Sequence, residues 1–291
     1  MDTAFALQLL VNGLMIGAVY ALIASGLSLT FGVIGIVNFA HGELYMVFAM
    51  LAYFAAGYLE VPFSLSIALV VLTALCAGAV LYEVLLRRLA GKDFERSVLG
   101  TMGLAMVLQN GAIFLFTTTP RMVPHTLSYS AYTFGSVAVP ALKLIAAALA
   151  TAALGLVWWM LHHTQLGRAM RGLSQSHDAA MMVGIDVRGV SRLAVAVGVG
   201  LAGLAGAALA PVYSIHPTMG FAFIFKAFAI VTIGGLGNFG GTIVAALMIG
   251  MLESFAGTLG SLVMADTLSF AFMILILLFK PEGLFGRGVR I

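Results

Sequence analysis

Long runs of apolar residues, each separated from the next by a short polar or glycine-rich stretch, fill almost the whole chain. The runs lie at about residues 5–30, 43–60, 63–86, 97–117, 138–161, 193–212, 222–236, 242–259 and 264–279. A bilayer core takes about 20 apolar residues per helix, so runs of this length predict transmembrane helices. The pattern predicts an all-α polytopic membrane protein with about eight or nine transmembrane helices, forming a single transmembrane domain over residues 1–291.

Composition supports the same class. Of the 291 residues, 62% are hydrophobic and 9% are charged, and the mean hydropathy is +1.11; soluble domains carry about 25% charged residues. The first basic residue is Arg87, so the N-terminus lacks the positive region of a cleavable signal peptide, and the first run is expected to stay as a span. Cys76 is the single cysteine, which excludes a disulfide framework within the chain.

Basic residues gather in three clusters that indicate the orientation of the spans. The clusters are Arg87, Arg88, Lys92 and Arg96; Arg168, Arg171, Arg188 and Arg192; and Lys280, Arg287 and Arg290. Basic residues close to span ends mark the cytoplasmic side of a membrane. Three apolar runs precede the first cluster, so the N-terminus is expected outside and the C-terminus in the cytoplasm. The same reasoning places segment 118–140 outside and segment 163–192 inside. It also accounts for the excess of basic residues, so nucleic-acid binding is not needed to explain it.

Two glycine-containing stretches interrupt the helical pattern inside apolar sequence. The first break runs from Gly32 to Glu43 and the second from Gly234 to Thr242, and each contains an Asn-Phe pair. Non-helical backbone at membrane depth is tolerated where protein or a water-filled cavity satisfies it, and discontinuous helices often border a transport path. The candidate path residues are Asn38, His41, Gly42, Glu43, Gly234, Gly235 and Gly237. The alternative is that both breaks are tight turns or close-packing glycines at one membrane face.

Several ionisable residues lie within or beside the apolar runs. His41 and Glu43 adjoin the first break, and Glu43 would gain from the dipole of the helix that follows it. Lys226 and Glu253 lie within the seventh and eighth runs, where a charge needs a partner or water. These two are candidates for an ion pair, and contact of Glu253 with a partner subunit is the alternative.

Patterns typical of catalytic, metal or nucleotide sites are missing from the sequence. It contains no HExxH motif, no paired-cysteine spacing and no G-x-S-x-G elbow. A P-loop is also missing, because Gly91 and Lys92 are followed by Asp93 where Ser or Thr would hold magnesium. The sequence therefore predicts a transport protein with no catalytic residues, no metal site and no cofactor of its own. If ATP drives it, ATP and Mg²⁺ are held by another chain.

The segment 163–192 is the longest polar connection between apolar runs, and it predicts a short helix. Ser176 can cap this helix, Asp178 lies in its first turn, and Gly184 can end it. A short helix with small and Met-rich faces can place apolar anchors in a groove of a partner protein. A helix resting on the membrane surface is the alternative.

Motifs along the chain resemble one family of transporters. Asp178-Ala179-Ala180 followed by Gly184 resembles the EAA loop of bacterial ABC importer permeases, with Asp in place of Glu. Further stretches look like the branched-chain amino-acid permeases of the LivH type. These are Gly26-Leu27-Ser28-Leu29-Thr30-Phe31-Gly32, Asn38-Phe39-Ala40-His41-Gly42-Glu43, Gly167-Arg168-Ala169-Met170-Arg171, Lys226-Ala227-Phe228, Gly234-Gly235-Leu236-Gly237 and Lys280-Pro281-Glu282-Gly283-Leu284-Phe285-Gly286.

The resemblance implies the membrane-spanning permease subunit of an ABC importer in the cell inner membrane, moving branched-chain or similar amino acids. The residues implied to couple it to its ATPases are Gly167, Arg168, Asp178, Ala179, Ala180 and Gly184. Implied partners are a second permease of the LivM type, two cytoplasmic ATPase subunits and an external substrate-binding protein. Urea or short amides are alternative substrates, because relatives of this family import them. A secondary transporter or channel is the alternative mechanism.

Overall fold

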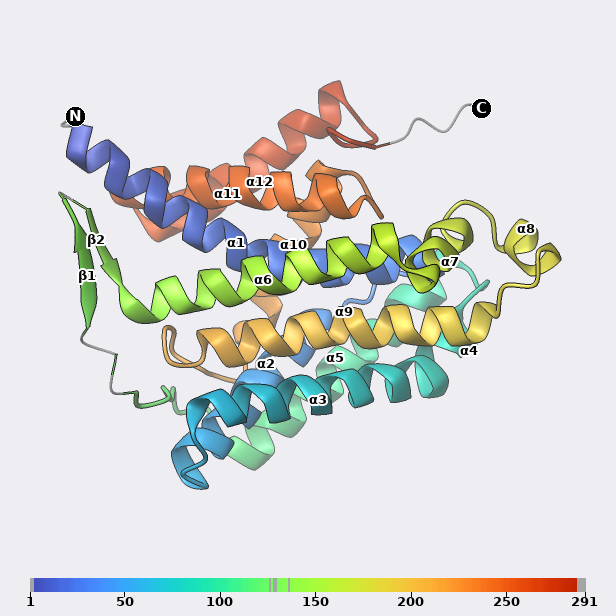
Figure 1. Cartoon of the computed structure of the whole chain (residues 1–291), viewed down its shortest axis with the longest axis horizontal. Coiled ribbons are helices and arrows are strands. Elements are labelled where there is room, and N and C mark those ends of the chain that lie inside the picture. The colour runs from blue at the N-terminus through green and yellow to red at the C-terminus, as the bar shows by residue number, and fades with distance from the viewer. Residues whose placement is uncertain (1–2, 126, 128–129, 136, 287–291) are drawn as a thin grey trace.

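The structure, a computed structural model, describes residues 3–125, 127, 130–135 and 137–286, and it is a bundle of helices in which several of the longest run along one common direction (Figure 1). The long helices are α1 (Thr3–Ile34), α2 (His41–Tyr53), α3 (Phe63–Leu81), α5 (Phe94–Phe116), α6 (Ala141–His163), α9 (Val187–Leu209), α10 (Met219–Gly234), α11 (Phe239–Leu259) and α12 (Leu262–Phe279). Shorter pieces are the π-helical turns Phe54–Tyr58 and Tyr82–Leu86 and the helices α4 (Arg87–Leu89), α7 (Gln165–Leu173) and α8 (His177–Met182).

Six helices within the described residues are long and apolar enough to cross a membrane. They are Thr3–Ile34, Phe63–Leu89, Phe94–Phe116, Ala141–His163, Val187–Leu209 and Phe239–Thr258, and Met219–Gly234 and Val263–Phe279 are shorter apolar helices. The predicted class, a helical polytopic membrane protein, is therefore confirmed. Every predicted apolar run contains a helix over most of its length, whereas the number of crossings stays a prediction.

A short antiparallel hairpin corrects the all-α expectation. β1 (Ala131–Phe134) pairs with β2 (Val137–Pro140), so the apolar run expected from residue 138 begins as a strand and continues as α6 only after Pro140. Val137 and Val139 alternate inward along β2, as β-branched residues do on a half-buried strand. The side chain of Gln8 holds the hairpin to α1, because it both donates to and accepts from the backbone of Ala138.

Helices α1 and α9 form the centre of the bundle. Helix α9 packs against α1, α2 and α3, and α1 also packs along the length of α11. Small residues allow the close approach of α1 and α11, since a Cβ built on Gly13 would lie 2.7 Å from the Cα of Met251. Helix α5, by contrast, is largely exposed, and its apolar surface faces out of the bundle.

The bundle has two distinct ends in Figure 1. The N-terminus and the β1–β2 hairpin lie at the left, here named the hairpin end, and α4, α7 and α8 lie at the right, here named the α8 end. The first two basic clusters meet at the α8 end, because Glu83 accepts from Arg188 and from Arg87. Arg287 and Arg290 of the third cluster lie outside the described residues.

Candidate functional site

The first break connects α1 to α2 through residues 35–40. It is shorter than predicted, because α1 continues through Gly32 to Ile34 before Gly35 adopts a positive φ of 71°. Asn38 closes the turn, since its Oδ1 accepts from the backbone N–H of Ala40 at 3.1 Å. The connection then turns straight into α2, so His41, Gly42 and Glu43 occupy the first turn of that helix.

His41 lies at the meeting point of three helices. Its side chain is fully buried, and its Nε2 lies 3.1 Å from the carbonyl oxygen of Ile23 on α1. A Cβ built on Gly26 would lie 3.1 Å from the imidazole ring and would collide with the carbonyl of Gly198 on α9. The two glycines therefore make room for the histidine between α1, α2 and α9.

Gly42 and Glu43 face the start of α10. A Cβ on Gly42 would collide with the carbonyl oxygen of Gly220, and a Cβ on Gly220 would lie 2.5 Å from Glu43 Oε2. The side chain of Glu43 is buried, and within the described residues its Oε2 has no hydrogen-bond partner. Asn38 Nδ2 and His41 Nδ1 are also buried without such a partner. Buried polar atoms without partners are rare and point to bound water, an ion or a functional role.

The second break is a tight turn between α10 and α11 at the α8 end. Gly235 and Gly237 have positive φ values of 96° and 78°, and Asn238 Oδ1 accepts from the N–H of Gly241 at 2.9 Å, which caps α11. The segment after α12 covers this turn, because Asn238 Nδ2 donates to the carbonyl of Phe285 at 2.7 Å. Gly234, at the end of α10, packs against Gly241, in the first turn of α11, so no side chain fits between the two helix ends.

The two breaks come together only in part. Gly237 of the second break lies against Gly32 near the end of α1, with a built Cβ 3.0 Å from the Gly32 Cα. Phe39 of the first break packs on Phe228 of α10, with ring centroids 6.1 Å apart. Gly42 and Glu43 instead contact the opposite end of α10 near Gly220. Their role in a translocation path therefore stays a prediction.

The predicted short helix of the polar connection is present as α8. The Ser176 side chain accepts from the N–H of Ala179 at 3.2 Å, Asp178 lies in the first turn, and Gly184 follows with a φ of 81°. These local features confirm the expected cap, first turn and end of the helix. The helix projects from the α8 end of the bundle (Figure 1). Ala180 is buried and the rest of α8 is exposed.

Helix α7 directly precedes α8 in the chain and packs against it. Thr164 caps α7 by accepting from the N–H of Gly167 at 3.1 Å, and a Cβ on Gly167 would collide with the backbone of Leu161. Arg168 follows in the same helix and is exposed, while Met170 is buried. Five of the coupling residues predicted from the sequence thus lie in two consecutive short helices, α7 and α8, at one end of the molecule, and Gly184 follows directly after α8.

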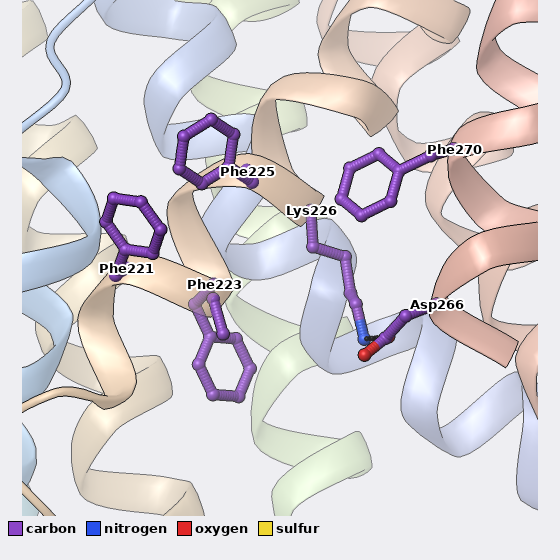
Figure 2. Close-up of a pocket in the computed structure, with 7 residues that line it drawn as sticks. Phe221, Phe223, Phe225, Lys226, Asp266 and Phe270 are labelled. Atoms are coloured by element: carbon purple, nitrogen blue, oxygen red, sulfur yellow. Dashed lines mark ion pairs between the residues drawn. The ribbon is translucent and has the colours of Figure 1, made fainter. Parts of the chain in front are cut away.

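A cluster of charges lies where α1, α10, α11 and α12 meet, and Asp266 at its edge is exposed. Lys226 donates to Glu253 Oε1 at 2.8 Å, which confirms the ion pair considered from the sequence, and it also pairs with Asp266 Oδ1 at 2.9 Å. Tyr20 donates to the same Glu253 oxygen at 3.0 Å. Figure 2 shows Lys226 and Asp266 reaching toward each other, with Phe225 of α10 and Phe270 of α12 above them in this view and Phe223 of α10 to their left.

Two cavities flank this charge cluster. One of about 360 Å³ lies beside Lys226 and Asp266 and is walled by phenylalanines (Figure 2). The other has a volume of about 330 Å³ and is lined by Tyr20, Lys143 and Glu253 among others. Phe223 lines both cavities. Both have sizes typical of small-molecule sites.

The chain matches the family described as branched-chain amino acid transport system / permease component over residues 9–277. It belongs to this family. The family describes a component of a transport system, and the chain is accordingly a multi-pass membrane permease.

Individual relatives agree with the permease family. The high-affinity branched-chain amino acid transport system permease protein BraD of Pseudomonas aeruginosa is 30% identical, covering 97% of this chain and 96% of that protein. The corresponding LivH protein of Escherichia coli K12 is 28% identical over the same shares of both chains. A solved structure, PsaBC from Streptococcus pneumoniae in complex with Fab, has a TM-score of 0.49 and 13% identity over 93% of this chain and 91% of that chain.

Sequence reasoning about this permease missed Tyr20, Asp266 and Lys143. Asp266 and Lys143 carried a usable signal, because each is a charge inside or beside an apolar run. Tyr20 carried none, since a tyrosine in an apolar helix is ordinary. Within the described residues, no three His, Cys, Asp or Glu side chains come together to form a metal site.

Proposed function

We propose that this chain is the membrane-spanning permease subunit of an ABC importer that moves branched-chain or similar amino acids across the cell inner membrane. ATP is hydrolysed by separate ATPase subunits, and an external binding protein delivers the substrate. The relatives BraD and LivH are both named as permease proteins of a high-affinity branched-chain amino acid transport system. A second permease of the LivM type completes the membrane part of the complex.

The observation that carries this proposal is the surface of α8. Met181, Met182 and Val183 are 56%, 88% and 76% exposed, and they stand next to Asp178 at the tip of the α8 end. Exposed apolar side chains on a short, capped helix suit a groove of a partner protein. We assign this groove to the ATPase, with Gly167, Arg168, Asp178, Ala179, Ala180 and Gly184 forming the coupling loop.

Hydrogen bonds between Arg188 and Glu83 connect the helix that follows α8 to the rest of the bundle. Arg188, in the first turn of α9, donates to both carboxylate oxygens of Glu83 at 3.0 and 2.8 Å, and Glu83 lies at the end of the α3 segment. In this proposal, closure of the ATPases shifts α8, and α9 and α3 move with it. The path then opens alternately to the two sides beside the breaks at Asn38–Glu43 and Gly234–Gly237. The buried atoms without partners at Asn38, His41 and Glu43 support a role for the first break.

We also propose an orientation with the N-terminus outside and the C-terminus in the cytoplasm, which requires an odd number of crossings and is met if all nine apolar runs cross. The meeting of the first two basic clusters at the α8 end supports this, because basic residues near span ends favour the cytoplasmic side.

Affinity purification of the tagged chain in mild detergent tests the importer assignment. Wild-type chain is expected to bring down ATPase subunits, and Asp178→Ala combined with Met182→Asp is expected to lose them without loss of folded permease. Asp93→Ala is the control, because it removes another exposed carboxylate at the same end of the bundle, in the connection between α4 and α5 and not in α8. A stable chain that transports amino acids without any ATPase would instead establish a secondary transporter.

A further inference from the structure

We propose that the 330 Å³ cavity beside Glu253 binds a zwitterionic aliphatic amino acid, with Glu253 holding the ammonium group and Lys143 holding the carboxylate. This inference rests on the proposed function and adds the residues that recognise the substrate. The cavity lies between α1, α6, α9 and α11, toward the hairpin end. In the proposed orientation that end faces the external binding protein.

Glu253 presents one carboxylate oxygen that lacks a partner. Its Oε1 accepts from Lys226 at 2.8 Å and from Tyr20 at 3.0 Å. Its Oε2 is buried, and no described residue donates to it. An unsatisfied buried acceptor is costly, and a bond from a charged donor is strong, so an ammonium group entering the cavity gains on both counts. Lys226 and Tyr20 are positioning residues that fix the carboxylate.

Lys143 supplies the complementary cation. It lies in the first turn of α6, is half-buried and lines the same cavity as Glu253. Within the described residues it forms no ion pair. A half-buried ammonium next to apolar helices favours an anionic partner, which the substrate carboxylate provides.

The charges and walls of the cavity fit a neutral substrate with an apolar side chain. Glu253 and Lys143 line the cavity with opposite charges, and the neighbouring Lys226 also pairs with Asp266, so the site favours a ligand that carries both signs over a net cation or anion. Met15, Val19 and Phe223 provide apolar wall. Burial of an aliphatic side chain against that wall is favourable in proportion to the apolar area removed from water.

Direct binding of tritiated leucine to the full chain in nanodiscs, purified without the soluble external binding protein, tests the site. Leucinamide, which lacks the carboxylate, and 4-methylpentanoate, which lacks the ammonium group, are the competitors. Glu253→Gln is expected to weaken leucine about tenfold or more and to leave 4-methylpentanoate unchanged. Lys143→Gln is expected to weaken leucine similarly and to leave leucinamide unchanged.

Two control variants remove exposed charges of the same types elsewhere, Glu95→Gln and Lys92→Gln, and both are expected to bind leucine as wild type does. Lys143→Gln breaks no ion pair within the described residues, so it keeps the test valid where Glu253→Gln lowers the yield of folded protein. Unchanged leucine affinity in both cavity variants would overturn the site, and so would the absence of leucine binding to wild type at millimolar concentration.

The importer assignment is judged by a separate measurement, ATP-driven leucine uptake by the assembled complex. Uptake without binding to the permease overturns the cavity proposal and leaves the proposed function standing. Selective binding without ATP-driven uptake supports the cavity and overturns the importer.

Discussion

At the scale of single residues, glycines decide how closely the helices approach one another. Gly42 lies against the backbone of Gly220, and Gly26 lies against Gly198 and the ring of His41. In a membrane the helices gain little from a hydrophobic effect between them, so close packing of small residues carries much of their association. Side chains larger than glycine at these contacts must push whole helices apart.

Gly42→Val is therefore expected to destabilise the permease and to abolish transport. Overpacking of a tight contact costs about 1–3 kcal/mol, and the added atoms would meet the Gly220 carbonyl and Ile224 of α10. Thermal unfolding in detergent and leucine uptake measure the two effects. Gly103→Val is the control, because a Cβ at Gly103 meets no atom within 4 Å. Wild-type uptake and unfolding temperature in Gly42→Val would remove Gly42 from both the packing and the path.

At the scale of secondary structure, side-chain caps set where the helices begin. Thr164, Ser176, Asp186, Asn238 and Ser261 each accept from a backbone N–H three residues later. Such caps satisfy donors that the helix itself leaves open. Asn238 has a second task, because its amide also holds the segment after α12 through Phe285.

Asn238→Ala is expected to lower stability by about 1 kcal/mol through the lost cap and to release the C-terminal segment from the turn. Limited proteolysis near Phe285 reports the release, and thermal unfolding reports the stability. Ser261→Ala, which removes the cap of α12, is the matched variant. It should lower stability comparably and leave proteolysis near Phe285 unchanged, and faster cleavage in both variants would contradict a specific role of Asn238.

At the scale of the whole molecule, the two ends of the bundle differ in chemistry. The α8 end carries Glu83 with Arg87 and Arg188, together with the exposed apolar tip of α8. The hairpin end carries β1–β2, fastened to α1 by Gln8. This polarity suits a protein whose ATPases contact one end and whose binding protein contacts the other.

Labelling of single cysteines in intact cells tests the orientation. In a Cys76→Ser background, Tyr132→Cys on β1 is expected to react with a membrane-impermeant maleimide from outside. Met182→Cys on α8 is expected to react only after permeabilisation, and both side chains are exposed. The reverse pattern would invert the topology, and reaction of both sites in intact cells would contradict a structure that spans the membrane between them.

Local patterns in the sequence determined much of this protein. Runs of apolar residues predicted the helices, because burial in a bilayer needs only length and hydrophobicity. Ser176, Asp178 and Gly184 predicted α8, because a cap, a first-turn acid and a terminal glycine act within one short segment. The break before α2 and the turn before α11 were also visible, since glycines and Asn-Phe pairs interrupt the pattern there.

Contacts between distant residues were decided by the tertiary structure alone. Tyr20, Lys226, Glu253 and Asp266 are spread over four helices, and only their packing brings the other three together around the ammonium group of Lys226. The β1–β2 hairpin depends on the pairing of its two strands and on its contact with α1, and local sequence propensity predicts neither. The cavity beside Lys143 likewise exists only where several helices surround it. Hydrophobicity and caps act along the chain, whereas recognition of a ligand requires groups that the chain brings together from far apart.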